Sequence, residues 1–179
     1  SSTLGRPLND KVSSIQFLSA LARQAGVIVY KDANFGGFHE IFIASDANLT
    51  DSILGKEDEI SSLQIIGKYR VTLYDGANFS IKDAKGNETA WLRLDNTDPA
   101  NPKEDHSPQL SSGGGHEGST NNIFRISDFA KYCFLEPGKN VCTRETFSDK
   151  ISSIKIEVPD EISADQKLGG ACKDNFCTL

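Results

Sequence analysis

Two kinds of internal repeat constrain the fold of this chain more than any other feature of its sequence. The first kind occurs three times, at residues 9–17, 57–65 and 148–156. Each copy has aspartate at its second position, serine at its fifth and sixth, and apolar residues at its seventh and ninth. Because side chains alternate between the two faces of a β-strand, the end of each copy predicts a strand with one buried face. The Asp-x-x-Ser-Ser stretch predicts a polar turn before that strand.

The second kind of repeat occurs twice, at residues 27–37 and 71–80, with an offset of 44 residues. Both copies begin with a β-branched run that ends in tyrosine, Tyr30 or Tyr74, and both continue into Ala-Asn-Phe. β-branched and aromatic residues favour strands, whereas asparagine and glycine tolerate positive φ. Each copy therefore predicts a strand that enters a folded-over hairpin.

Together the repeats predict an all-β fold in which Greek-key units pack as a sandwich. No stretch keeps a helical period for three turns. Residues 17–24 come nearest, and they predict at most a short linker helix that Gly26 could stop.

The spacing of the three serine-bearing copies is uneven, because they begin 48 and then 91 residues apart. Either the unit that starts near Lys68 carries a long insertion or a degenerate unit lies between; we favour the insertion. Residues 95–122 are rich in Pro, Asn, Ser and Gly, which predicts a mobile surface loop. Residues 9–17 form a final strand without a preceding hairpin. Their own hairpin has been removed, or they complete the unit of the second hairpin as a circular permutation.

Both repeats resemble motifs of the βγ-crystallin family. Residues 30–37 fit its Tyr-x-x-x-x-Phe-x-Gly hairpin, and residues 9–14 fit its (Asn/Asp)-(Asn/Asp)-x-x-(Ser/Thr)-Ser calcium signature at every position. Glu57 and Ser148 depart from the first signature position, and Ser80 and Ile81 stand where the second hairpin should have small glycines. The resemblance covers roughly residues 9–82 and 130–157.

The resemblance implies a βγ-crystallin-like Greek-key β-sandwich with a long loop insertion. Its parts would be a partial N-terminal motif and linker at 1–26, a domain at 27–158 and a Cys-bearing tail at 159–179. Within the domain the motifs would span 27–67 and 68–158, with the insertion at about 95–122.

The resemblance further implies Ca²⁺ binding, because this hard cation takes six to eight oxygen ligands from carboxylates, hydroxyls and carbonyls. The signature aspartates would supply carboxylates and the serines three residues later hydroxyls. The remaining ligands would come from the hairpin of the partner motif, just after its tyrosine. At that position Lys31 could add only its carbonyl, whereas Asp75 could add a carboxylate. With one or two carboxylates per site, we expect affinities on the order of 10⁻⁶ to 10⁻⁴ M. The candidate metal-site residues are Asn9, Asp10, Ser13, Lys31, Glu57, Asp58, Ser61, Asp75, Ser148, Asp149 and Ser152. The serines that come next in each copy, Ser14, Ser62 and Ser153, look structural.

Cysteines and sequons indicate a secreted, extracellular protein. The chain starts without methionine, which predicts a processed product without its signal peptide. Four cysteines in an even number favour disulfides over a zinc ribbon or a Cys-x-x-Cys redox site, and sequence alone allows three pairings. A cross-strand bond within the hairpin around Pro137-Gly138 is one plausible pairing. The cysteines are Cys133, Cys142, Cys172 and Cys177, and the glycosylation candidates are Asn48, Asn78 and Asn87.

Several function classes are disfavoured. A net charge of −6 with scattered Lys and Arg argues against a nucleic-acid partner, and no apolar run is long enough for a membrane span. His106 and His116 fit solvated loops, Trp91 fits a buried strand position, and no catalytic constellation or nucleotide fingerprint is present. We therefore expect a non-enzymatic structural or stress-related protein. The alternatives are an extracellular binding effector, such as a protease inhibitor or toxin, and a carbohydrate or cell-surface adhesion module.

Overall fold

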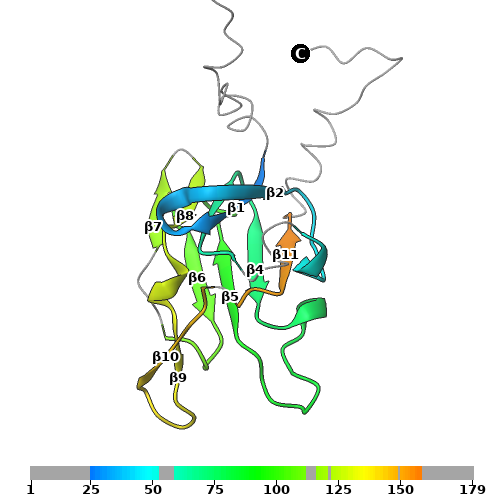
Figure 1. Ribbon diagram of the computed structural model, residues 1–179. Helices are drawn as coiled ribbons and strands as arrows, with labels where there is room; N and C mark the ends of the chain where they lie inside the picture. Colours follow the sequence, from blue (N-terminus) through cyan, green and yellow to red (C-terminus); the bar gives the residue numbers. More distant parts are fainter. Residues whose placement is uncertain (1–24, 53–58, 112–115, 121, 149, 159–179) are drawn as a thin grey trace, which may run out of the picture.

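The computed structural model describes residues 25–52, 59–111, 116–120, 122–148 and 150–158 (Figure 1). The described chain folds into two antiparallel sheets that pack face to face, with a separate two-stranded hairpin at one side. The first sheet has the strand order β2-β1-β3-β8-β7, and the second has the order β11-β4-β5-β6. No helix in the described residues is both long enough and apolar enough to cross a membrane.

Short strands make up almost all of the regular structure. They are β1 (Gly26–Asp32), β2 (Gly36–Phe42), β3 (Ser62–Ile66), β4 (Arg70–Tyr74), β5 (Trp91–Asp95), β6 (Lys103–His106), β7 (His116–Thr120), β8 (Ile123–Ile126), β9 (Cys133–Leu135), β10 (Cys142–Thr146) and β11 (Ser153–Glu157). Single turns of 3₁₀ helix are η2 (Ala33–Phe35), η3 (Leu49–Asp51), η5 (Ala77–Phe79) and η6 (Phe129–Lys131).

Two motifs build the sandwich by exchanging a segment. In the first motif β1, β2 and β3 share one sheet, but Asp46 forms a bridge to Ile154 of β11 in the opposite sheet. In the second motif β4, β5 and β11 share a sheet, and β8 crosses over to pair with β3. This crossing is the Greek-key connection, and it makes the fold βγ-crystallin-like, as the sequence resemblance implies.

The inward faces of the strands supply the core between the sheets. Burial alternates along β5 and most of β3, as period two predicts. Residues 26–29 of β1 and 71–74 of β4 are all buried, so both faces of these strands are covered. The apolar strand residues with no exposed surface are Val27, Val29, Leu63, Ile65, Val71, Leu73, Leu92, Leu94, Phe124 and Ile126. Phe129, Tyr132 and Phe147 close the core beside the β9–β10 hairpin, with Phe129 and Phe147 packed edge to face at 6.2 Å between ring centroids.

Each folded hairpin contains a strained asparagine–phenylalanine pair. Asn34 and Phe35 have φ of 57° and 62°, and Asn78 and Phe79 have φ of 59° and 55°. Left-handed backbone is uncommon for a bulky residue, and holding it costs on the order of 1–3 kcal/mol per residue. The surrounding structure must therefore impose this conformation on both phenylalanines.

A buried serine holds each hairpin. The Ser62 hydroxyl accepts a hydrogen bond from Phe35 N–H at 3.0 Å and donates to the Asp32 carbonyl at 2.7 Å. The Ser153 hydroxyl accepts from Phe79 N–H at 3.1 Å and donates to the Gly76 carbonyl at 2.6 Å. Both serines are 0% exposed. The sequence suggested that their hydroxyls hold the backbone of their own turn, whereas here they bond the backbone of the hairpin.

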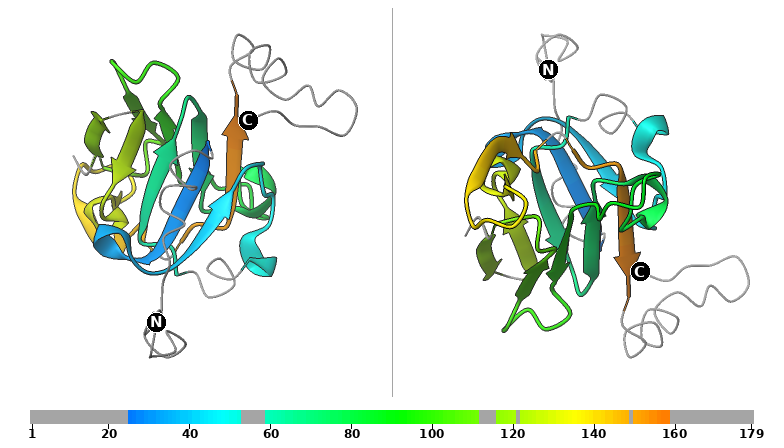
Figure 2. Two further views of the ribbon diagram at one scale, coloured as in Figure 1. Left: turned by 90° about the horizontal axis from the view of Figure 1, so that it is seen from above. Right: turned by 90° about the horizontal axis from the view of Figure 1, so that it is seen from below.

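The 91-residue interval between signature copies comes from an insertion into the second motif, since β4 and β11 belong to one unit. We expected residues 95–122 to be a surface loop, but this stretch contains β6 and β7. β6 extends the second sheet beyond β5, and β7 extends the first sheet beyond β8. The β9–β10 hairpin is a further addition, and Figure 2 shows it on the opposite side of the molecule from η3 and η5.

The permutation hypothesis for residues 9–17 is corrected by the strand order. β4 pairs with β11 on one side and with β5 on the other, so the final-strand position of the second motif is already filled. Residues 9–17 themselves, like the tail at 159–179, lie outside the described part of the chain.

Replacing Ser153 with alanine tests the hairpin clamp. Ser153→Ala leaves the Phe79 amide and the Gly76 carbonyl without their buried partner, so unfolding free energy should fall by about 1–3 kcal/mol. The neighbouring Ser152→Ala is the matched control, because this half-buried side chain should change stability by less than about 0.5 kcal/mol. Urea denaturation in EGTA measures both variants. Equal losses in the two would contradict the clamp.

Removing the disulfide tests the side hairpin. Cys133 and Cys142 are joined across β9 and β10 with 5.5 Å between their Cα atoms, which is one of the pairings that the sequence left open. For a loop of nine residues, chain entropy gives a stabilisation of about 2–3 kcal/mol. We expect the double variant Cys133→Ala/Cys142→Ala to lose this amount in thermal denaturation. A reductant should destabilise the wild type by the same amount and leave the double variant unchanged.

Candidate functional site

Oxygen atoms of the turns, and not clusters of strong metal-binding side chains, form the candidate site. In the described residues no three His, Cys, Asp or Glu side chains come close enough to hold a metal ion together. A cation bound within this part of the chain would depend on hydroxyl and carbonyl oxygens with few carboxylates. Such a donor set suits Ca²⁺ better than zinc, which prefers His and Cys.

Each signature turn docks on the folded hairpin of its own motif. The Ser61 N–H donates to the Tyr30 carbonyl at 2.9 Å, and the Ser152 N–H donates to the Tyr74 carbonyl at 2.8 Å. We call these places the first junction (Lys31, Glu59 and Ser61) and the second junction (Asp75, Lys150 and Ser152). The two identical backbone contacts relate the junctions by an approximate twofold symmetry.

The other motif closes each junction with a short 3₁₀ turn. Phe129 N–H of η6 donates to the Ser61 carbonyl at 2.8 Å, and Leu49 N–H of η3 donates to the Ser152 carbonyl at 3.0 Å. The turns are fixed by their N-cap side chains, since Asp128 accepts from Ala130 N–H and Asn48 accepts from Thr50 N–H.

Two signature copies meet directly at the first junction. The Ser148 hydroxyl lies 3.0 Å from the Ser61 hydroxyl, although 87 residues separate them in the chain. Ser148 is the first position of its copy and Ser61 is the fifth position of the other. The fold thus gathers oxygens from both motifs at one point.

The structure describes five of the eleven candidate metal-site residues. Lys31, Ser61, Asp75, Ser148 and Ser152 lie in the described residues, at or beside the two junctions. The residues Asn9, Asp10, Ser13, Glu57, Asp58 and Asp149 lie outside them, as do Cys172 and Cys177. The resemblance implied that ligands come from the hairpin of the partner motif. In the structure the hairpin at each junction belongs to the same motif, and the partner motif contributes Ser148 and the 3₁₀ turns.

Sequence reasoning did not single out Glu59 and Lys150. Both occupy the third position of a signature copy, which the family pattern leaves open. Glu59 accepts a hydrogen bond from the Lys31 ammonium at 2.5 Å, within the first junction. The sequence did contain a signal for these two residues, because the third position is charged in both described copies, acidic in one and basic in the other.

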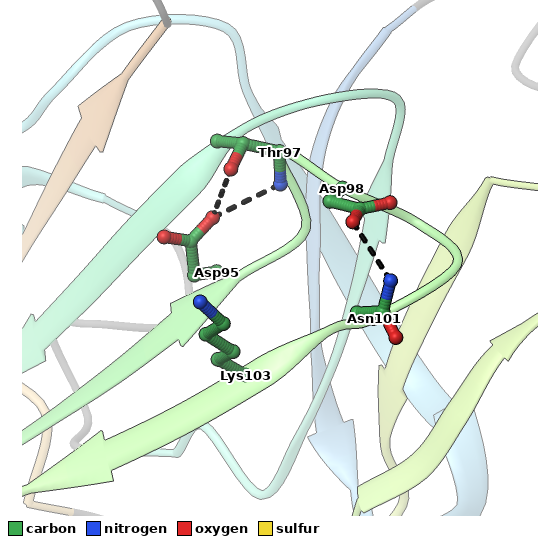
Figure 3. A pocket seen from close by; sticks show the side chains of 5 residues that line it. All are labelled: Asp95, Thr97, Asp98, Asn101 and Lys103. Carbon is green, nitrogen blue, oxygen red and sulfur yellow. Dashed lines mark hydrogen bonds between the residues drawn. The ribbon is translucent and has the colours of Figure 1, made fainter.

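A separate depression of about 400 Å³ lies at the turn between β5 and β6 (Figure 3). Its lining residues are Asp95, Thr97, Asp98, Asn101 and Lys103. The acidic groups are already engaged by their neighbours: Asp95 accepts from Thr97 N–H at 3.0 Å, and Asp98 accepts from the Asn101 amide at 2.9 Å. Lys103 points toward Asp95 in Figure 3. The two acidic side chains that line this depression therefore already have hydrogen-bond partners within the same turn.

Two isolated side chains differ from their sequence-based interpretation. Trp91 is half-buried, and the Arg93 guanidinium lies 5.1 Å from its ring centroid, so the indole is partly covered by a cation–π contact. His106 belongs to β6 and not to a loop; its ring Nδ1 lies 3.1 Å from the Ser107 carbonyl oxygen. Neither arrangement places a base beside a nucleophile.

Comparisons with known proteins concern the fold. No protein-family model matches the sequence, and no curated protein matches it. Among solved structures, the chain is similar to a βγ-crystallin domain described in work on the evolution of the eye lens fold. The two are 18% identical, with a TM-score of 0.42, over 75% of this chain and 87% of that one.

Two further solved structures show similar figures. The βγ-crystallin of Ciona intestinalis is 17% identical, with a TM-score of 0.39, over 74% of this chain and 99% of that one. A βγ-crystallin domain of Flavobacterium johnsoniae is 23% identical, with a TM-score of 0.34, over 75% of this chain and 96% of that one.

The Arg70–Asp95 pair beside the depression predicts a pH-dependent stability. Burial opposes ionisation of Asp95, but hydrogen bonds from Thr97 and the Arg70 guanidinium outweigh it and lower the pKa of this carboxyl. A lowered folded-state pKa stabilises the fold above the unfolded value of about 3.9, and this contribution disappears as pH falls through the folded pKa.

We therefore expect Asp95→Asn to cost about 1 kcal/mol of unfolding free energy at pH 7, and this cost should shrink as the pH falls below about 3.9 and through the lowered folded-state pKa. Denaturation of both proteins across this pH range measures the difference. Asp105→Asn is the control, because Asp105 is 62% exposed and lies 3.7 Å from Arg93. A pH-independent cost for Asp95→Asn would contradict the role assigned to its charge.

Proposed function

We propose that this chain is a secreted, non-enzymatic, calcium-binding protein of βγ-crystallin-like fold with a structural or stress-related role. The observation that carries the proposal is the meeting of the Ser61 and Ser148 hydroxyls from two signature copies at 3.0 Å. A chain that used its Asp-x-x-Ser-Ser turns only to begin strands would have no need to bring two of them together.

The donor chemistry of the junctions fits Ca²⁺. Hydroxyls of Ser61 and Ser148, the carbonyl of Lys31 and the carboxylates of Glu59 and Asp75 are all oxygen ligands. The signature aspartates Asp58 and Asp149 remain predicted ligands from the sequence, as does Asp10 in the N-terminal copy. The ion would join a signature turn to the hairpin and to the other motif, and its binding energy would add to the stability of the sandwich.

Several observations support the extracellular part of the proposal. Cys133 and Cys142 form a disulfide, which persists in oxidising compartments. The sequon residues Asn48, Asn78 and Asn87 are all exposed, so a glycan on any of them would project into solvent. Extracellular fluid is rich in calcium, which suits sites of modest affinity.

Thermal denaturation with and without calcium tests the proposal. Binding to the folded state alone should raise the unfolding free energy by about 2.7 kcal/mol when free calcium is a hundredfold above Kd. EGTA should reverse the rise, and Mg²⁺ at the same concentration should produce less, since it demands a small octahedral site. A melting curve that ignores both calcium and EGTA would refute calcium binding.

Calorimetry on single variants locates the site. Asp58→Ala and Ser61→Ala should weaken calcium binding by about tenfold or more, because each removes an oxygen ligand. Ser62→Ala should lower stability yet leave the calcium Kd nearly unchanged, since its hydroxyl is used within the hairpin. Equal effects of Ser61→Ala and Ser62→Ala on Kd would contradict the assignment.

A further inference from the structure

The two junctions carry opposite charges at equivalent positions. The backbone bonds from Ser61 to Tyr30 and from Ser152 to Tyr74 make Lys31 equivalent to Asp75, and Glu59 equivalent to Lys150. At the first junction the hairpin supplies the cation and the signature turn supplies the anion. At the second junction these roles are exchanged.

At the first junction the two charges are in contact. The Lys31 ammonium lies 2.5 Å from Oε1 of Glu59, and the two side chains are 38% and 32% exposed. Lys31 directly follows Tyr30, and Glu59 lies two residues before Ser61, so the pair spans the hairpin and the turn at the place where they dock. The Lys31 ammonium is therefore paired with the carboxylate that a metal ion at this junction would need.

We propose that Lys31 and Lys150 act as tethered cations that set the calcium affinity of the two junctions. This inference rests on the proposed function. At the first junction the Lys31 ammonium pairs with the Glu59 carboxylate when calcium is absent. At the second junction the sequence places Lys150 in the turn and the opposite charge of Asp75 in the hairpin. Calcium must compete with this built-in charge for the carboxylate and must also approach a positive group. The lysines thus keep the calcium affinity of both junctions low and stabilise the fold when calcium is absent.

A partly exposed ion pair is worth up to about 1 kcal/mol, which corresponds to about fivefold in a binding constant. Lys31→Met keeps an unbranched side chain that is one atom shorter and removes the charge. We expect it to tighten calcium binding by up to about fivefold, and to lower the melting temperature slightly in EGTA. Lys150→Met should act in the same way at the second junction, and the double variant should tighten both.

The control is Lys139→Met. Lys139 forms a similar contact with Glu136, at 2.7 Å, but this pair lies in the β9–β10 turn. The variant makes the same change in net charge, so a calcium affinity equal to that of the wild type shows that any gain in Lys31→Met is local. Adding Glu59→Gln to Lys31→Met should remove the gain, because the released carboxylate is then absent.

Calorimetric titration with calcium, together with the calcium-induced shift in melting temperature, separates the outcomes. Tighter binding in Lys31→Met but not in Lys139→Met supports the inference, even where the wild type itself binds too weakly to measure. Wild-type binding with an unchanged Kd in Lys31→Met and Lys150→Met overturns the inference and leaves the proposed function standing. Absence of calcium binding in every variant overturns both.

Discussion

Each motif of this sandwich depends on one buried serine hydroxyl. Ser62 and Ser153 each bond both the amide and a carbonyl of a hairpin whose Asn-Phe pair has left-handed backbone. Without such a partner these hairpins would relax, because a phenylalanine at positive φ carries about 1–3 kcal/mol of strain, whereas asparagine tolerates this conformation. The serine that begins the final strand of each motif thus fixes the hairpin. The hairpin in turn binds the signature turn through the backbone of the preceding serine, Ser61 or Ser152.

The second hairpin has a different residue at one position, and the chain that follows it takes a different path. In the first hairpin Gly37 has φ of 71°, and a Cβ there would lie 2.6 Å from the Asp32 carboxylate, so this position requires glycine. With glycine there, β2 follows the hairpin directly and pairs with β1. The equivalent residue is Ile81, and a β-branched side chain does not tolerate that conformation. The chain therefore leaves the hairpin for an exposed excursion, bridged at Lys82 and Glu88, before β5 returns to pair with β4.

The repeats carried enough information to predict the hairpins and the two-motif sandwich, because those features depend on local residue types in a fixed order. They did not predict that Ser62 and Ser153 bond the hairpins, which depends on long-range packing. They could not predict β6 and β7. Lys-Glu-Asp-His and His-Glu-Gly-Ser-Thr have no apolar alternation, and these strands exist because the unpaired edges of β5 and β8 accept backbone partners. The meeting of Ser61 with Ser148 was equally invisible, since it depends on how the motifs cross.

Exchange of segments between the motifs builds each junction from both halves of the sandwich. The first junction receives η6 and Ser148 from the second motif, and the second junction receives η3 from the first. Because each junction contains residues from both motifs, a change of charge at either junction acts on both halves of the sandwich. The asymmetry of the charged positions then has a physical meaning. Two junctions that share a backbone plan but exchange cation and anion would respond differently to the same ion, and a single chain would contain two unequal sites.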